Sequence, residues 1–443
     1  MIREERQFTV DLAVIGSGLA GFAASIFAIN RGIRTAQIGN TGAVAYTTGY
    51  LDLFGRLESD QLLDDPWRGL QQLAASQPQH PLARVTEAEV RTAFSEFVAF
   101  LTEAGVPYAP PGERNVMALT PAGTIKPTLC VPSTMQAGVD ALAKQARCLI
   151  IDFRGLRGFS ARQLVANLRS QWPQLWAEQL VFPGMEHGEL YPEVMARTLE
   201  VPERREELAV AIRAVLGDAE AVGLPAILGM HHPHLVLAEM ERLVGRPLFE
   251  IPTMPPAVPG IRLREMFEQV FPARGLTLIP QQKVAAVDFA GDAIRLSLAD
   301  SYGPIAISAQ TVILATGRFL SGGLLASFDG ISEPLIGLPV TQPDSRDHWF
   351  REQYMDKEGH PVHTAGLATD RDFRPLTAGG APYDRRLFAA GLILAHQDWI
   401  RGRCGAGIAL ASAFRAVDAV GEILARRDGQ AGKHQSAEGR RDV

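Results

Sequence analysis

The sequence predicts an α/β protein with parallel sheets, in which one domain is interrupted by a second, inserted domain. At the N-terminus, a strand, a glycine-rich turn, a helix and a second strand follow one another within about 30 residues. Far along the chain, residues 311–318 form an apolar segment that ends in a second glycine turn. Between them, residues 148–251 alternate between strand-like and helix-like patterns, which is typical of a separate α/β domain.

The N-terminal motif is the most specific of these features. Residues 8–15 are apolar, a G-x-G-x-x-G turn occupies 16–21, an alanine-rich helical segment ends at Asn30, and a second strand covers 34–38. This is the context in which the glycine pattern binds a dinucleotide, so we expect a Rossmann-like fold. The expected cofactor-binding residues of the turn are Gly16, Ser17, Gly18, Leu19, Ala20 and Gly21.

The glycines of this turn have separate roles in such a fold. Gly16 allows the tight turn, Gly18 lets the backbone approach a pyrophosphate, and Gly21 lets helix and strand pack closely. The second strand should end in an acidic residue that holds a ribose, but the chain has Gln37 and Asn40 in this stretch, which would bind a ribose more weakly. The glycines alone therefore leave NAD, FAD and a shorter flavin open.

Composition excludes several classes of function. The chain has 443 residues with 43 Lys and Arg against 49 Asp and Glu, so its net charge of −6 disfavours nucleic acid as the main partner. Residues 12–30 carry no charge and imitate a membrane anchor, but the glycine turn interrupts them, and we expect a cytoplasmic protein. Gly is in excess, with 42 residues, and these glycines gather in the segments discussed below.

No metal site is expected. The cysteines Cys130, Cys148 and Cys404 are isolated from one another, which fits a reducing compartment and no iron–sulfur cluster or zinc. Three histidines lie within 231–234, but Pro233 breaks the helical spacing that would direct them to one ion. We expect these histidines to lie in a solvated loop.

Three further segments suggest a flavin. In flavoproteins with an N-terminal dinucleotide fold, small residues after the second strand often run along the isoalloxazine, although a simple loop with Ser/Thr turns is the alternative here. The strand that ends at 316–317 resembles the second nucleotide-binding element of such proteins, and the glycine-rich start of a helix at 405–407 suits negative charge on a reduced flavin. The expected cofactor-binding residues of these segments are Thr47, Thr48, Gly49, Thr316, Gly317, Gly391, Gly405, Ala406 and Gly407.

Two residues near the C-terminus depart from the flavoprotein pattern or add to it. After Gly391 these proteins have an acidic residue that binds the ribityl chain, whereas this chain has Leu392. Cys404 precedes the helix at 405–407 and is expected to be a packing or flavin-facing residue, with a redox thiol as the alternative.

The domain organisation follows from these segments. The cap is predicted from strands at 148–153, 179–182, 225–230 and 248–251, and from helices at 161–169, 203–216 and 234–243. We therefore expect a two-dinucleotide-fold flavoprotein domain with an inserted α/β cap domain. The expected boundaries are 1–60 for the first part of the flavin-binding domain, 61–260 for the cap, 261–425 for the second part and 426–443 for a disordered tail.

Longer strings carry a closer resemblance. The chain resembles the B subunits of anaerobic glycerol-3-phosphate dehydrogenases, which belong to the fumarate reductase-like flavoproteins. The matching strings span most of the chain outside the interior of the cap and are much more specific than G-x-G-x-x-G. They cover residues 47–54, 252–263, 313–324, 333–338, 366–375 and 404–413.

This resemblance implies a function and partners. It implies one flavoprotein subunit of a complex that converts glycerol 3-phosphate to dihydroxyacetone phosphate and passes electrons to quinone. An A subunit with FAD would carry out the oxidation, and an iron–sulfur C subunit would dock the complex on the inner face of the cell membrane. The B subunit is attributed FMN, which agrees with the two missing acidic residues, whereas the intact 16–21 turn favours FAD as the alternative.

Two other functions stay open. One is an autonomous flavin oxidoreductase that resembles fumarate reductase flavoproteins, and the other is a structural partner subunit whose flavin site has decayed. The catalytic residues are unknown. Candidate bases are His360, His363 and His396, and candidate phosphate ligands are Arg318, Arg346, Arg371, Arg374, Arg385 and Arg403.

Overall fold

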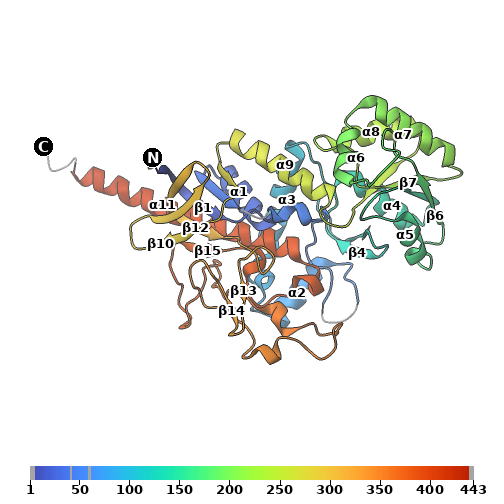
Figure 1. Cartoon of the computed structure of the whole chain (residues 1–443). Coiled ribbons are helices and arrows are strands. Elements are labelled where there is room, and N and C mark those ends of the chain that lie inside the picture. The colour runs from blue at the N-terminus through green and yellow to red at the C-terminus, as the bar shows by residue number, and fades with distance from the viewer. Residues whose placement is uncertain (1–4, 40–41, 58–60, 439–443) are drawn as a thin grey trace. The chain divides into compact units, whose positions relative to one another are not determined.

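The computed structural model describes residues 5–39, 42–57 and 61–438, and it consists of two compact units (Figure 1). The first unit contains Met1–Gly42, Leu70–Phe97 and Val270–Val443, and the second contains Ala43–Gly69 and Val98–Gln269. These units divide the chain at other positions than the expected boundaries, because residues 43–60 group with the second unit and residues 70–97 with the first. Assigning a flavin-binding role to one unit and a cap role to the other stays a prediction.

The first unit is built on a mixed sheet with a parallel centre. The order is β10 (Ala286–Asp288), β11 (Ile294–Asp300), β12 (Gly303–Leu314), β1 (Arg6–Ile15), β2 (Thr35–Gly39) and β9 (Thr277–Pro280), with β15 (Leu387–Ala389) beside the last residues of β12. The strands β15, β12, β1, β2 and β9 are parallel to one another, whereas β11 pairs antiparallel with both β10 and β12. Ile15 pairs with both Leu314 and Ile38, so three carboxyl ends are level at one edge of the sheet.

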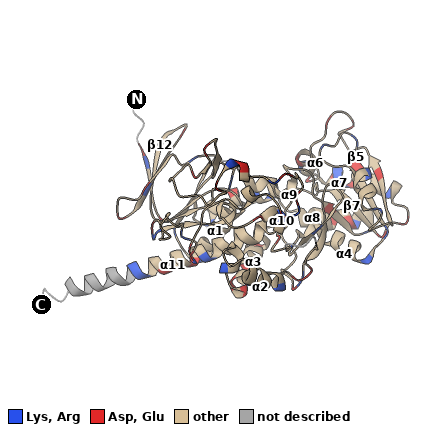
Figure 2. Ribbon diagram, turned by 90° about the horizontal axis from the view of Figure 1, so that it is seen from below, with Lys and Arg blue, Asp and Glu red and all other residues tan. Residues whose placement is uncertain are grey.

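Helix α1 (Leu19–Asn30) packs against α11 (Gly405–Glu438) in this unit. Nearly all of α1 is buried and it carries no charged residue, as the uniform colour of its ribbon in Figure 2 shows. The Phe27 and Phe414 rings meet edge to face with centroids 5.2 Å apart, a favourable geometry for aromatic pairs. At the helix end, Arg31 bonds to Asp418 and Glu96 at 2.9 and 3.0 Å.

The second unit contains a parallel four-stranded sheet and a hairpin. The sheet order is β6 (Leu175–Leu180), β5 (Cys148–Phe153), β7 (Ala221–Pro225) and β8 (Leu248–Ile251), and β3 (Val116–Leu119) pairs antiparallel with β4 (Ile125–Thr128). All six residues of β5 are buried, because alternate side chains enter two apolar clusters on opposite faces. Its helices are α4 (Gln136–Lys144), α5 (Ala161–Leu168), α6 (Pro192–Thr198), α7 (Pro202–Val215) and α8 (Pro233–Val244).

The remaining helices are short or belong to both units. Helices α2 (Pro66–Ser76), α3 (Glu87–Glu103) and α9 (Val258–Ala273) each contribute residues to both units along the chain, and α10 (Trp399–Gly402) precedes α11. Between β12 and β15 the chain forms long loops, orange in Figure 1, with the two-residue strands β13 (Leu325–Ala326) and β14 (Ile331–Ser332).

An ion pair is buried in the interior of the second unit. Both oxygens of Glu250 accept hydrogen bonds from the Arg262 guanidinium, at 2.6 and 2.7 Å, and the two side chains are 0 and 2 % exposed. The Thr134 hydroxyl and the Leu228 amide also donate to this carboxylate. Burial by itself would raise the pKa of Glu250, but the Arg262 charge and these hydrogen bonds outweigh it and hold the pKa below its ordinary value. The carboxylate therefore stays ionised inside the unit.

The α/β fold with largely parallel sheets is confirmed, with local corrections. Strand β6 ends at Leu180 and β7 ends at Pro225, so the predictions at 179–182 and 225–230 were placed too far along the chain. Residues 226–230 are buried apolar loop residues, which periodicity alone does not distinguish from a strand. Helix α11 continues to Glu438 through much of the segment predicted as a disordered tail, and residues 439–443 lie outside the described residues.

Candidate functional site

The glycine turn at 16–18 leaves the start of α1 without a cap. Gly18 is the N-cap residue with an extended backbone (φ −92°, ψ −177°), and no side chain caps the helix. Phe22 donates the first helical hydrogen bond, to the Gly18 carbonyl oxygen, and the first turn contains no acidic residue. Residues 16–19 are half-buried, so this end of the helix is accessible. Its free N–H groups and its partial positive charge suit a phosphate group.

Two glycines of the turn are required by close packing. Gly16 has φ +138°, and a Cβ there would lie 2.6 Å from the carbonyl carbon of Ala315, at the end of β12. A Cβ on Gly21 would lie 2.9 Å from the carbonyl carbon of Gly16, where helix and turn meet. Both contacts are far below ordinary van der Waals distance, so only glycine fits these two positions. Gly18 has no such constraint in its backbone conformation.

The structure brings the end of β12 to this turn. The Ala315 amide donates to the Ile15 carbonyl oxygen at 2.8 Å, so residues 316–317 follow directly beside the glycine turn. The Thr316 hydroxyl is buried and has no hydrogen-bond partner among the described residues. Gly317 has φ +69°, and the Ser321 hydroxyl donates to the Thr316 carbonyl oxygen at 2.6 Å, which closes the loop after the strand. Thr316 therefore offers an unused polar group at the carboxyl edge of the sheet.

The C-terminal segment joins the same edge at Gly391. Its φ is +79°, its amide donates to the Ser412 hydroxyl at 2.9 Å, and a Cβ there would lie 2.5 Å from Cβ of Ala20. Residues 405–407 begin α11, where Gly405 is half-buried and the next two residues are buried. Cys404 is fully buried and not in a disulfide. The turn, the end of β12 and Gly391 thus come together although they are distant in sequence.

The position expected to hold a ribose is filled differently. Gly39 is the last residue of β2, and a Cβ there would lie 2.8 Å from the Ser17 amide nitrogen and would overlap the Ser17 side chain. The Gln37 side chain is fully buried and donates to the Gly16 carbonyl oxygen at 3.0 Å, so it supports the turn and is not exposed to a ribose. Asn40, the other candidate, lies outside the described residues. A side chain at residue 39 is excluded by Ser17.

Thr47, Thr48 and Gly49 belong to the second unit. The Gly49 amide donates to the Thr47 hydroxyl at 3.2 Å, which is the Ser/Thr turn that was the alternative explanation of this segment. Gly49 has φ +88°, and a Cβ there would lie 2.8 Å from Cβ of Pro259. Local packing therefore accounts for this glycine, and a contact of these residues with a flavin stays a prediction.

Among the three candidate bases, His363 has the geometry of a proton-handling group. Its Nδ1 lies 3.0 Å from the Asp398 carboxylate, a pairing that orients the ring. Both His360 ring nitrogens contact backbone groups, and burial together with the Arg84 charge lowers the pKa of His396. Asp398 is a residue that the sequence did not single out, because it lies 35 positions from His363.

The candidate arginines have diverse surroundings. The Arg318 guanidinium donates to the Val362 and His363 carbonyl oxygens, and its burial lowers its pKa. Arg374 pairs with Asp370 at 2.7 Å, and Arg346 lies over aromatic rings of the loop region. These contacts do not join Arg318, Arg346 and Arg374 in a common anion site.

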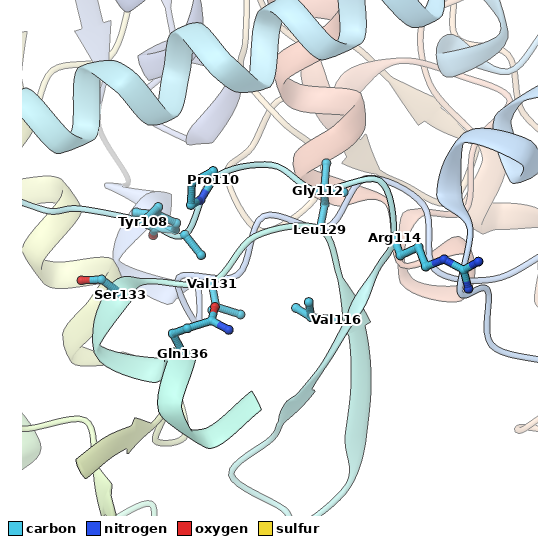
Figure 3. A pocket seen from close by; sticks show the side chains of 10 residues that line it. Tyr108, Pro110, Gly112, Arg114, Val116, Leu129, Val131, Ser133 and Gln136 are labelled. Atoms are coloured by element: carbon cyan, nitrogen blue, oxygen red, sulfur yellow. The ribbon is translucent and has the colours of Figure 1, made fainter. Parts of the chain in front are cut away.

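The second unit also contains a cavity of about 500 Å³ (Figure 3). Its walls are mainly apolar, and in Figure 3 the Arg114 side chain extends away from the other labelled residues; it pairs with Asp64. A phosphate ester needs cationic groups that face it, and the lining of this cavity does not offer them. The lining residues are Tyr108, Ala109, Pro110, Gly112, Arg114, Val116, Leu129, Val131, Ser133 and Gln136.

Comparisons with known proteins identify the family to which the chain is similar. Residues 11–408 match the family described as FAD binding domain. The chain is 30% identical over 420 residues to the B subunit of anaerobic glycerol-3-phosphate dehydrogenase from Vibrio vulnificus (strain YJ016), covering 92% of this chain and 95% of the relative. It is 28% identical over 452 residues to the protein of the same name from Aliivibrio fischeri (strain ATCC 700601 / ES114), covering 97% and 99%.

Solved flavoenzyme structures are more distant. The 3-ketosteroid delta1-dehydrogenase of Sterolibacterium denitrificans superposes with a TM-score of 0.41 at 11% identity, covering 93% of this chain and 99% of that chain. A flavocytochrome c3 fumarate reductase superposes with a TM-score of 0.40 at 10% identity, covering 94% and 78%.

Proposed function

Because the chain belongs to the FAD binding domain family and, within it, to the anaerobic glycerol-3-phosphate dehydrogenase B subunits, we propose that it is a flavin-carrying subunit of such a dehydrogenase. The family is one of flavin oxidoreductases. In this proposal the complex oxidises glycerol 3-phosphate to dihydroxyacetone phosphate, and this chain takes part in electron transfer toward quinone. The observation that carries the proposal is the uncapped, accessible N-terminus of α1 beside the tightly packed glycine turn.

The described residues would hold the phosphate end of a flavin in three ways. The N–H groups of the first turn of α1 would donate to phosphate oxygens, and the absence of acidic side chains in that turn avoids repulsion. The unpartnered Thr316 hydroxyl would supply a further hydrogen bond. Gly391 and the first residues of α11, which we expect to contact the flavin, would form the rest of the site. A bound flavin would supply the capacity to accept two electrons and to release them singly.

The choice of flavin is part of the proposal, and we place FMN first. The family match favours FAD, which has an adenosine half with a second ribose. In this chain Gly39 lies against Ser17, so no acidic side chain holds that ribose at the end of β2. A single terminal phosphate needs only the N-terminus of α1, which is accessible. The accessible N-terminus of α1 supports the phosphate contact that FMN and FAD would share, and among the described residues no acidic side chain ends β2 to hold the adenosine ribose of FAD.

The partners and the location belong to the same proposal. The relatives are named as a subunit, which supports a complex of several chains. We infer a catalytic FAD-containing A subunit and an iron–sulfur C subunit that docks the complex on the inner face of the cell membrane. Among the described residues, none of the helices combines the length and the apolar character needed to span a bilayer. In this proposal, attachment to the membrane therefore depends on a partner subunit.

Identification of the bound flavin tests the proposal directly. The chain is purified, its flavin is released by acid, and the released compound is identified by mass. FMN in near-equal amount to protein supports a flavin-carrying subunit with FMN as its flavin, and FAD alone would overturn the ranking of the two flavins. A chain that binds neither flavin on reconstitution contradicts the proposal and favours a structural subunit.

A second candidate function is an autonomous flavin oxidoreductase, and the His363–Asp398 pair favours it. A histidine oriented by a carboxylate is suited to transfer a proton to or from a substrate. The two functions differ in what the isolated chain can do. Turnover of glycerol 3-phosphate by the lone chain with an artificial electron acceptor, lost in His363→Gln while flavin content is retained, would establish the second function. Activity that requires the A and C subunits supports the first.

A further inference from the structure

Large apolar side chains gather on the exposed loops of the first unit. Nearly half of the exposed large hydrophobic residues in the described part of the chain lie in three short segments, 319–328, 350–355 and 399–400. Phe328 and Tyr354 are each 88 % exposed. We call the following six residues the apolar patch: Leu320, Phe328, Phe350, Tyr354, Met355 and Ile400. Monomeric soluble proteins rarely expose large apolar clusters, and such clusters usually mark interaction sites.

Several contacts tie the three segments into one surface. Arg346 donates to the Ser327 carbonyl oxygen at 2.8 Å, and its guanidinium lies over the Phe328 and Trp349 rings at 5.9 and 5.1 Å. His360 packs edge to face on Phe350 with centroids 5.5 Å apart, and its Nε2 is 2.9 Å from the Tyr354 carbonyl oxygen.

The third segment joins through α10. Arg401 donates to the Asp356 carbonyl oxygen at 3.2 Å, next to the loop that carries Tyr354 and Met355. The carboxylate of Asp398, one residue before α10, contacts the His363 ring, and Arg318 holds the backbone at His363. The apolar patch is therefore a defined surface of the first unit that lies close to the end of β12.

The position of the patch relates it to electron transfer. Phe319 and Leu320 follow Gly317 by two and three residues, and Gly317 lies beside the glycine turn through the end of β12. The loop that carries Leu320 and Phe328 therefore begins at the edge of the sheet at which we place the flavin. Electrons that leave this flavin must cross to another chain, so a partner bound at this surface would receive them over a short path. This step rests on the proposed function.

The charges around the patch identify the kind of partner. Between residues 319 and 358, acidic residues outnumber basic ones seven to three. The exposed side chains of Asp329, Asp344, Asp347 and Glu352 form no ion pair with any described residue, whereas Arg351 is paired with Glu358 at 2.7 Å. A second copy of this chain would bring acidic groups against acidic groups, and an anionic lipid surface would be repelled. A protein with a basic rim around an apolar centre fits both features.

We propose that the apolar patch docks a partner subunit of the same dehydrogenase, which presents exposed apolar side chains surrounded by Lys and Arg. The exposed aromatic residues Phe328, Phe350 and Tyr354 are the anchors, because such residues contribute most of the binding energy of interfaces. The unpaired acidic residues align the partner and increase the rate of association.

The test uses the full chain produced together with its A and C subunits. Phe328→Asp combined with Tyr354→Asp changes two almost fully exposed side chains, so the fold is retained. We expect the affinity of this variant chain for the partner subunit to fall on the order of 30-fold or more relative to the unchanged chain. The affinity is measured by titrating the purified chain with the purified partner subunits. The matched control is Tyr302→Asp, because Tyr302 is 75 % exposed in the turn between β11 and β12 and lies outside the patch. It should assemble like the unchanged chain.

Flavin content and charge variants separate the possible failures. Flavin measured in the same preparations reports on the proposed function independently of assembly. Asp344→Lys with Asp347→Lys should weaken assembly and reduce its dependence on salt. Unchanged affinity of the Phe328 and Tyr354 double variant for the partner would overturn the docking surface. The proposal would also be overturned if the lone chain forms a dimer that this double variant abolishes. The same holds if the lone chain binds vesicles of anionic lipid and the double variant does not.

Discussion

Gly18→Val separates flavin binding from folding, because the backbone of Gly18, unlike that of Gly16, has a conformation that other residues adopt. Its φ of −92° and ψ of −177° lie in the extended region, which valine adopts readily. Valine is a poorer N-cap residue than glycine, so the expected loss of stability is about 1 kcal/mol. By contrast, Gly16→Ala combines φ +138° with overlap at Ala315 and would damage the fold itself.

The loss of flavin affinity is expected to be much larger than the loss of stability. The valine side chain would stand in front of the N–H groups at the start of α1, which have no capping side chain. A hydrogen bond to a charged group contributes about 1.5–3 kcal/mol, so losing two of them costs about 3–6 kcal/mol. That corresponds to flavin binding weaker by about 10² to 10⁴-fold.

Titration of the flavin-free chain with FMN and FAD, followed by flavin fluorescence, measures this affinity, and thermal unfolding of the same samples measures stability. Gly32→Ala is the matched control at the other end of α1. Its φ is +67° and a Cβ there meets no atom within 4 Å, so strain alone costs about 1 kcal/mol. Gly18→Val that binds flavin like the unchanged chain, or no worse than Gly32→Ala, would refute the placement of the phosphate at α1.

Three further predictions concern stability. Burial, with a smaller contribution from His396, lowers the pKa of His80 to about 4. The folded state therefore favours the neutral ring, and the free energy of unfolding decreases as the pH falls below about 6.5. The loss from pH 7 to about pH 5 is about 2 kcal/mol by urea unfolding, and His80→Asn should remove it. Glu250→Leu leaves the Arg262 charge buried alone and should cost about 3–5 kcal/mol in the same assay, most of which the added Arg262→Met should restore. Gly39→Asp should cost about 1–3 kcal/mol by overlap with Ser17, as seen in unfolding midpoints, and Ser17→Gly in the same chain should restore only part of it, because the backbone nitrogen of residue 17 still lies 2.8 Å from the added Cβ.

Much of the local structure could be predicted from the sequence because its signals are local. The order of strand, glycine turn, helix and strand at the N-terminus corresponds to β1, α1 and β2, and the apolar runs at 148–153 and 248–251 coincide with β5 and β8. Periodicity placed α5, α7 and α8 within two residues at each end. It failed at β7, where buried loop residues continue the apolar run after Pro225.

The candidate site could be predicted only in part. The glycines at 16, 18 and 21 follow a spacing that is visible in the chain, but the reason for each glycine depends on its neighbours. Gln37 seemed available to a ribose from its place after the strand, yet its amide is buried and holds the turn. The contact of Gly39 with Ser17 has no signal in the spacing, because it depends on how β2 lies against the turn.

By itself, the sequence determined which segments become strands, helices and glycine turns, because backbone preferences and hydrophobic periodicity act over a few neighbouring residues. The tertiary structure alone decided that Gly16 lies against Ala315, that Gly391 lies against Ala20, that His363 faces Asp398, and that apolar loop residues remain exposed together. These contacts join segments up to 371 residues apart, Ala20 and Gly391 being the most distant. They depend on strand order and on which faces pack, and neither property is written in the spacing of residues along the chain.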